Sequence, residues 1–316
     1  MFSWFTNLWS SLFKRKPTTT VPATTTTVTT EGKKMRKKAL FVGINYVGTQ
    51  NQLNGCINDV ILVNQIVRDF FGFGKDDSTN VRMLTEESAT TANIKERLKW
   101  LVDGAQSGDV LLLDYSMHGV QMACPNYEEH KEADGLDECI CPIDFDWRNN
   151  VIRDNDMIEI FKNLPAGVNL TVISDSCHSG DLLREVVNPM IQPSASPNKA
   201  RTMPIPPDIR NRAYGMQNRQ TMREIRNINN EQVGILISGC KSTQTSADAW
   251  IQKVGKYHGA LTYYLTEILK ENKYNITYAD LVAQINKRLA ADGYTQNPQL
   301  DCAEGLQNKK FLQPLI

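Results

Sequence analysis

A cysteine and a histidine each follow a short apolar run in this chain of 316 residues. Cys177 comes just after the run at residues 171–174, and His118 comes just after the run at residues 110–113. Such runs are typical of buried strands, so neighbouring strands could present a thiol and an imidazole side by side. A thiolate is the attacking species in cysteine catalysis, and a nearby imidazole can generate it. The pair therefore predicts nucleophilic catalysis by cysteine.

Each member of the pair has an expected role. In open α/β sheets, ligands bind beyond the carboxyl ends of the strands, which is where both residues fall. We expect His118 to act as the base and Cys177 as the nucleophile, with the backbone N–H groups of Gly119 and Cys177 as oxyanion donors. No side chain stands out as an orienter of the imidazole, although a backbone carbonyl can do this. His258 is expected at the surface.

The elements that must position this pair follow from hydrophobic patterning. Short apolar runs predict further strands at residues 39–44, 81–84 and 233–238, and a last strand at 310–312. Amphipathic stripes predict helices at residues 56–71, 259–269 and 278–289. They also predict one helix that begins near residue 91 and another that ends at residue 161. Alternating strands and helices predict an α/β fold, a three-layer sandwich with a mostly parallel sheet and helices on both faces.

Composition narrows the class of protein. Lys plus Arg and Asp plus Glu number 35 each, so no overall charge favours nucleic acid as a partner. Seven cysteines in a chain of this length favour free thiols in a reducing compartment. We expect a cytoplasmic protein.

Three segments differ from the rest of the chain. Residues 1–16 combine aromatic and apolar residues at helical spacing with a basic cluster, which predicts either an amphipathic leader for a membrane surface or partner groove, or a disordered leader. Residues 17–36 are rich in threonine and predict a linker. Residues 181–230 carry six prolines and eight basic residues, which predicts a flexible insertion in the domain over residues 37–316.

Five ordered stretches resemble the metacaspases, the caspase-like cysteine peptidases of clan CD. The two around the catalytic pair are residues 115–119 (YSMHG) and 175–180 (DSCHSG). The other three are residues 39–46 (ALFVGINY), 53–60 (LNGCINDV) and 238–249 (SGCKSTQTSADA). The chain resembles a type I metacaspase, with a short leader in place of a long prodomain. Met117 stands where the family usually has glycine.

The resemblance implies cleavage of peptide bonds after Arg or Lys. In the family, the S1 pocket is lined by the positions that match Cys56, Asp59, Ser116 and Asp175. Two carboxylates suit a guanidinium fork or a lysine point charge. The expected partners are therefore proteins or peptides with Arg or Lys at P1, and the enzyme is expected to work as a monomer.

The resemblance also implies calcium as a cofactor. Asp137 and Asp154 match two of the family's ligand positions, and Asp156 is a further candidate. Carboxylate oxygens are suitable calcium ligands. The pattern departs at Asn155, where a second aspartate is usual, and at Arg184, where a later acidic residue is usual.

The basic insertion has an expected role as a substrate. Its Arg and Lys residues suit an acidic S1 pocket, so we expect self-cleavage within residues 181–230, or gating of the cleft by this segment, and synthesis as a zymogen. The competing hypothesis is a non-catalytic, caspase-like scaffold that binds a membrane or a partner through its N-terminal helix.

Overall fold

The computed structural model describes residues 35–123, 136–177, 198–204, 234–240 and 244–315. The expected leader over residues 1–16 lies outside the described residues, as do residues 17–34 of the expected linker. Of the expected insertion over 181–230, residues 198–204 are described. No helix among the described residues is long and apolar enough to cross a membrane.

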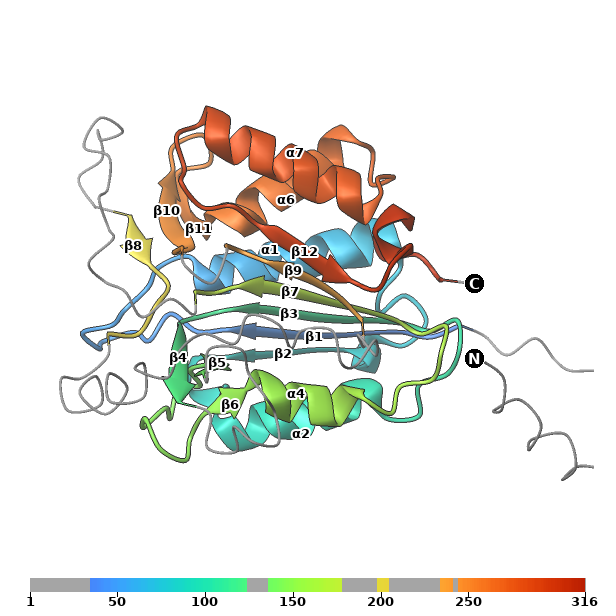
Figure 1. Ribbon diagram of the computed structural model, residues 1–316, viewed down its shortest axis with the longest axis horizontal. Helices are drawn as coiled ribbons and strands as arrows, with labels where there is room; N and C mark the ends of the chain where they lie inside the picture. Colours follow the sequence, from blue (N-terminus) through green and yellow to red (C-terminus); the bar gives the residue numbers. More distant parts are fainter. Residues whose placement is uncertain (1–34, 124–135, 178–197, 205–233, 241–243, 316) are drawn as a thin grey trace, which may run out of the picture. The chain divides into compact units, whose positions relative to one another are not determined.

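A six-stranded sheet with the strand order β12-β9-β7-β3-β1-β2 lies at the centre of residues 35–316 (Figure 1). In chain order its strands are β1 (Lys37–Gly43), β2 (Val81–Thr85), β3 (Val110–Ser116), β7 (Asn169–Asp175), β9 (Ile235–Ser238) and β12 (Gln299–Cys302). Neighbouring strands run parallel except β12, which is antiparallel to β9.

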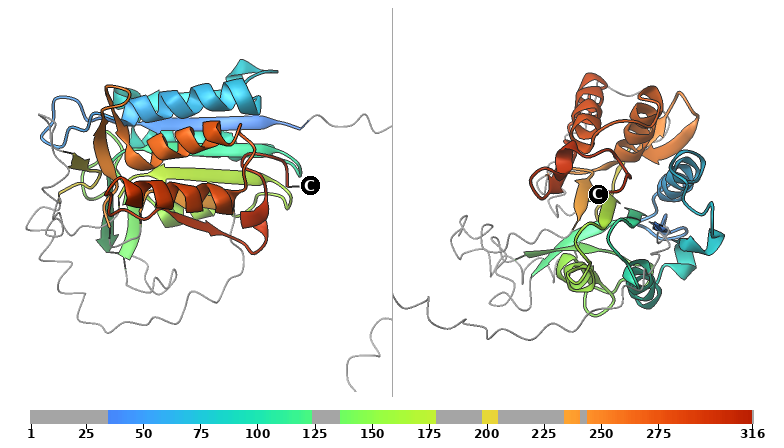
Figure 2. Two further views of the ribbon diagram at one scale, coloured as in Figure 1. Left: turned by 90° about the horizontal axis from the view of Figure 1, so that it is seen from above. Right: turned by 90° about the vertical axis from the view of Figure 1, so that its right-hand side faces the viewer.

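Helices cover both faces of this sheet (Figure 1 and Figure 2). One face carries α1 (Cys56–Phe71), α6 (Ala260–Glu271) and α7 (Tyr278–Ala291), and the other carries α2 (Thr91–Val102) and α4 (Asp154–Phe161). Strand β1 shows why both faces must be covered, because its successive side chains point to opposite sides. Phe41 packs in the core under α1, α6 and α7, while Leu40 packs in the core under α2 and α4. The expected α/β fold class is confirmed.

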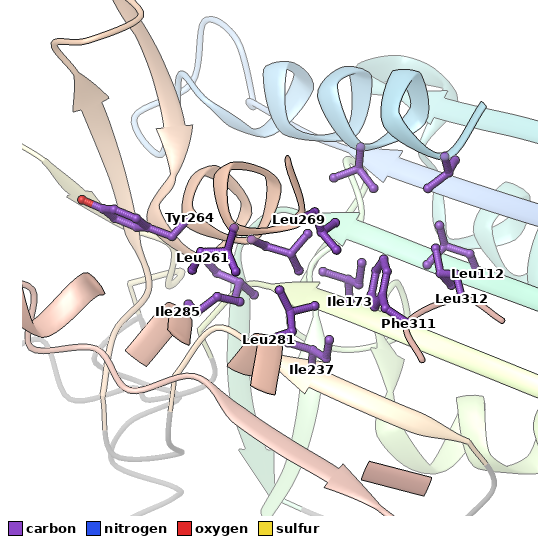
Figure 3. Close-up of a cluster of buried hydrophobic side chains, with 14 of the residues drawn as sticks. Leu112, Ile173, Ile237, Leu261, Tyr264, Leu269, Leu281, Ile285, Phe311 and Leu312 are labelled. Atoms are coloured by element: carbon purple, nitrogen blue, oxygen red, sulfur yellow. The ribbon is translucent and has the colours of Figure 1, made fainter. Parts of the chain in front are cut away.

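The core on the α6 and α7 side joins parts of the chain that are far apart in sequence (Figure 3). Leu112 of β3, Ile173 of β7 and Ile237 of β9 meet Leu261 of α6 and Ile285 of α7 in this cluster. Burial of these side chains stabilises the packing of the middle strands, whose ends carry the candidate site.

Two three-stranded sheets lie beyond the carboxyl ends of the central strands. One contains β4 (Gly119–Ala123), β5 (Leu136–Ile140) and β6 (Ile152–Arg153), and the other contains β8 (Lys199–Ala200), β10 (Ala247–Ile251) and β11 (Lys256–Gly259). Their strands are short and carry polar residues, so their pattern is that of a loop rather than of a buried strand.

Two expectations about the C-terminal part were wrong. Residues 310–312 form no strand; Lys310 makes an isolated bridge with Thr277, and the last strand is β12. His258 is buried in β11 instead of lying at the surface. The apolar residues Phe311 and Leu312 fill the core as a turn, which a short apolar run cannot reveal.

Candidate active site

His118 and Cys177 follow two neighbouring parallel strands at the same level. In the register of β3 and β7, Ser116 pairs with Asp175 at the ends of the two strands. His118 and Cys177 each lie two residues beyond that pair, and both are buried. The sheet therefore brings the expected thiol and imidazole to one edge.

The imidazole of His118 is held by the backbone carbonyl of Asn51. His118 Nε2 lies 2.7 Å from Asn51 O, while Nδ1 has no hydrogen-bond partner among the described residues. With Nε2–H donating to that carbonyl, Nδ1 carries the lone pair. Burial lowers the pKa of His118 to about 4, because a charged ring would lose its hydration. The ring is thus neutral near pH 7 and able to accept a proton at Nδ1.

Ser246 and Cys240 surround the thiol of Cys177. The backbone N–H of Ser246 contacts Cys177 Sγ, and Ser246 O lies 3.4 Å from it. Cys240 Sγ lies 4.0 Å from Cys177 Sγ. Both neighbours come from the stretch at residues 238–249. The sequence did not predict that this stretch would contact the thiol.

The carbonyl of Arg201 lies against the two expected oxyanion donors. Gly119 N–H donates to Arg201 O at 3.0 Å, and Cys177 N–H donates to the same oxygen at 3.2 Å. Two N–H groups that converge on one carbonyl oxygen are the geometry that stabilises a developing oxyanion. The arrangement polarises the carbonyl of the bond between Arg201 and Thr202.

The side chain of Arg201 fills a pocket made of carboxylates. It is fully buried, and Nη2 lies 2.7 Å from Asp59 Oδ2 and 3.0 Å from Asp248 Oδ1. Nη1 lies 3.2 Å from Asp175 Oδ1 and donates to Ser116 Oγ at 2.6 Å. Because these anions surround the guanidinium, the pKa of Arg201 is raised well above its ordinary value, despite burial.

Backbone N–H groups fix the carboxylates of this pocket. Gly259 N–H donates to Asp59, and Gly55 N–H donates to Asp248 Oδ1 at 2.9 Å. Thr262, in the first turn of α6, donates its N–H to Asp175 Oδ2 at 3.0 Å. Free N–H groups at a helix start favour an anion there. His258, expected at the surface, instead lies with Nδ1 2.9 Å from Asp59 Oδ1.

The expected pocket residues therefore gather around Arg201, with one addition. Asp59, Ser116 and Asp175 contact its side chain directly. Cys56 is buried at the start of α1, where burial raises the pKa of its thiol and the charge of Arg201 opposes this. Asp248 was missed as a pocket residue, since β10 was not predicted; the only signal was its place in one of the five stretches.

Residues 199–203 cross the site as an added strand would. β8 pairs antiparallel with β10, and Arg201 N–H donates to Ser246 O at 3.1 Å. On the other side of the Arg201 carbonyl, Met203 N–H donates to Gly119 O at 3.2 Å. Peptidases and peptide-binding domains hold extended ligands by such main-chain bonds, with side chains in pockets. This segment of the chain has the conformation of a bound peptide.

The three expected calcium ligands do not gather around a common point. Asp137 Oδ2 lies 2.6 Å from Arg153 Nη1, and Asp137 Oδ1 accepts a hydrogen bond from Asn155 Nδ2 at 3.1 Å. Asp156 Oδ2 accepts from the backbone N–H of Arg153 at 3.1 Å, and Asp154 Oδ1 accepts from Asn155 N–H at 2.8 Å. Within the described ranges, no three His, Cys, Asp or Glu side chains are grouped as metal ligands. This arrangement does not fit a calcium ion.

Comparisons with known proteins agree with the geometry. A family model described as the metacaspase, peptidase C14 domain matches residues 37–185. Metacaspase-1 of Schizosaccharomyces pombe is 32% identical over 304 residues, which cover 88% of this chain and 69% of that protein. Metacaspase-9 of Arabidopsis thaliana is 30% identical over 331 residues, covering 89% of this chain and 98% of that protein.

The fold is also similar to a solved structure. Protein GSU0716 from Geobacter sulfurreducens superposes with a TM-score of 0.62 at 25% identity, covering 89% of this chain and 100% of that one. Sequence and fold thus agree over most of the chain, which belongs to the metacaspase family of cysteine-type peptidases.

Proposed function

We propose that this metacaspase is an endopeptidase that cleaves after Arg or Lys, and that it cuts its own chain between Arg201 and Thr202. The proposal rests on the contacts that Arg201 makes with both its side chain and its backbone carbonyl. Its guanidinium lies among three carboxylates, while its carbonyl accepts hydrogen bonds from Gly119 and Cys177. A substrate residue at P1 needs both contacts at once.

The proposed reaction follows from these positions. His118 Nδ1 takes the thiol proton, and the Cys177 thiolate attacks the carbonyl carbon of Arg201. The negative charge that forms on the carbonyl oxygen is stabilised by the N–H groups of Gly119 and Cys177. The intermediate collapses to a thioester as the C–N bond breaks, and His118 returns the proton to the amine of Thr202. Water, activated by His118, then hydrolyses the thioester and releases the thiol.

Specificity follows from the charge of the pocket. An aspartate at P1 would enter beside three buried carboxylates, and repulsion and desolvation would both oppose it. A lysine carries the same charge as an arginine but cannot donate to several carboxylates at once through a planar fork. We therefore expect the order Arg, then Lys, with Asp excluded.

Self-cleavage can be tested on the purified chain. The wild-type protein is expected to give a fragment that begins at Thr202, as identified by mass spectrometry of its new N-terminus. The Arg201→Gln variant should lose this cut and Arg201→Lys should retain it, whereas Arg210→Gln, the matched control in the same basic segment, should not change it. A cut elsewhere with the 201–202 bond left intact would contradict the proposed site.

A second assay tests the nucleophile and the pocket. A fluorogenic peptide ending in Lys-Ala-Arg reproduces residues 199–201, and a second one ending in Lys-Ala-Asp replaces the arginine with an acidic residue. We expect kcat/KM to favour Arg by at least about 100-fold, which corresponds to about 2.7 kcal/mol. Cys177→Ala should abolish turnover. Cys56→Ala should keep measurable turnover, because burial raises the pKa of the Cys56 thiol and so disfavours its thiolate, and because the donors to the scissile carbonyl are the N–H groups of Gly119 and Cys177. No turnover of either peptide by the wild-type protein would favour the non-catalytic scaffold.

A further inference from the structure

The Arg153 guanidinium lies against Asp137, one of the two residues that match calcium-ligand positions of the family. Asp137, on β5, has a fully buried side chain, and that of Arg153 on β6 is 17% exposed. In the register of the two strands, Arg153 pairs with Cys139. Since side chains two residues apart share a face, Arg153 reaches Asp137 diagonally across the sheet.

Both oxygens of Asp137 accept hydrogen bonds from this neighbourhood. Arg153 Nη1 lies 2.6 Å from Oδ2, and Asn155 Nδ2 lies 3.1 Å from Oδ1. A buried carboxylate without a partner would be costly, so the cation of Arg153 supplies a necessary charge. Calcium needs oxygen ligands that face it. Here the Asn155 amide presents N–H to Asp137, and Arg153 presents a positive charge.

The neighbouring carboxylates are engaged in the same way. Asp156 caps the backbone N–H of Arg153 and forms an ion pair of 3.1 Å with Lys95 Nζ. Asp154 and Asp156 both lie in the first turn of α4, where a negative charge is favourable. These two residues therefore have structural roles that need no metal ion.

The pair of Asp137 and Arg153 is linked to the catalytic residues through strand pairing. β5 pairs with β4, and in their register Ile140 of β5 is opposite Gly119 of β4. Just beyond β5, Cys141 N–H donates to His118 O at 3.1 Å. A charge that fixes β5 to β6 thus supports the strand that carries an oxyanion donor and the backbone of the catalytic base.

We propose that Arg153 is a tethered cation that takes the place of a calcium ion, so that this sheet is organised at any calcium concentration. The inference concerns folding and metal binding of the β4-β5-β6 sheet, and only its effect on turnover rests on the proposed function.

Calorimetry and thermal unfolding test the inference without reference to proteolysis. The Cys177→Ala chain, which stays uncut, is expected to bind no calcium at 1 mM and to keep the same Tm with calcium or a chelator. Adding Arg153→Met should lower Tm by about 5 °C, since it leaves the Asp137 charge buried and unpaired. Millimolar calcium should then restore most of that loss, because Asp137 would accept the ion.

Two further variants make the result decisive. Arg153→Lys keeps a positive charge and should retain both the Tm and the indifference to calcium, which also guards against a failure of Arg153→Met to fold. Lys95→Met removes a different cation from the same cluster and should confer no calcium response. Calcium binding by the parent chain would overturn the proposal. So would a loss of stability in Arg153→Met that calcium does not reverse, because Arg153 would then be an ordinary ion-pair partner.

Discussion

Arg201 lies at the centre of the charges in the active site. Asp59, Asp175 and Asp248 surround its guanidinium, all of them buried. A fourth carboxyl, Asp114, has a pKa raised well above its ordinary value by burial and by the charges of Asp59 and Asp175, so its charged form is disfavoured. Removing Arg201 would leave three buried carboxylates facing one another. The pocket therefore favours a cation.

His118 gives the uncut protein a specific pH dependence. Its pKa falls from 6.5 to about 4 on folding. Between pH 6.5 and pH 4 the His118 imidazole binds a proton in the unfolded chain but not in the folded chain. The contribution of this residue to the free energy of unfolding is therefore complete above pH 6.5 and is lost as the pH falls towards 4. The loss amounts to about 3 kcal/mol. Urea unfolding of Cys177→Ala, with and without His118→Gln, measures it between these pH values.

The double variant is expected to have the shallower pH profile, because groups common to both proteins cancel in the difference. Parallel profiles for the two proteins would show that His118 is not held neutral by burial.

At the scale of elements, the N-terminus of α6 forms one wall of the pocket around the Arg201 side chain. Thr262 in its first turn donates to Asp175, and Gly259 at its N-cap donates to Asp59. A Cβ atom at Gly259 would touch both the Asp175 carboxylate and the Arg201 guanidinium. Any side chain at this position therefore takes space that the Arg201 guanidinium and the Asp175 carboxylate occupy.

We expect Gly259→Ala to reduce kcat/KM for the Lys-Ala-Arg peptide by at least about 100-fold, equivalent to about 2.7 kcal/mol, and to stop the cut after Arg201. Gly255→Ala is a matched control in the same hairpin. Its Cβ meets no atom within 4 Å, and it carries only the cost of a positive φ of 62°, roughly 1 kcal/mol. Peptide kinetics and Tm, measured for both variants, separate pocket blockage from instability. Turnover by Gly259→Ala at the rate of the control would contradict this role.

How much of the structure could be predicted depended on the kind of element. The strands that precede His118 and Cys177 are buried on both faces, so their apolar runs gave nearly correct bounds, and the two strands were expected to be neighbours. The strands β8 and β10 are short and partly polar, and they gain their partners only from the tertiary fold. Asp248 and the particular role of Arg201 were missed for this reason, although a basic residue in 181–230 was expected to suit the pocket.

Cleavage after Arg201 would divide the whole molecule between two fragments that share one sheet. The N-terminal fragment contributes β1, β2, β3 and β7, and the C-terminal fragment contributes β9, β12, α6 and α7. β7 and β9 pair through four residues, from Thr171 with Ile235 to Ser174 with Ser238. Side chains of both fragments, including Ile173 and Leu261, share one hydrophobic core (Figure 3).

The cut chain is therefore expected to remain a single particle. On size-exclusion chromatography the self-cleaved protein should elute at the volume of intact Cys177→Ala, while denaturing electrophoresis should show two bands. The physical reason is that cleavage removes one backbone link but no buried apolar surface. In urea the two fragments should separate and elute apart. Separate elution in native buffer would show that the sheet pairing of β7 with β9 and the shared core are too weak to hold the fragments together once the 201–202 bond is broken.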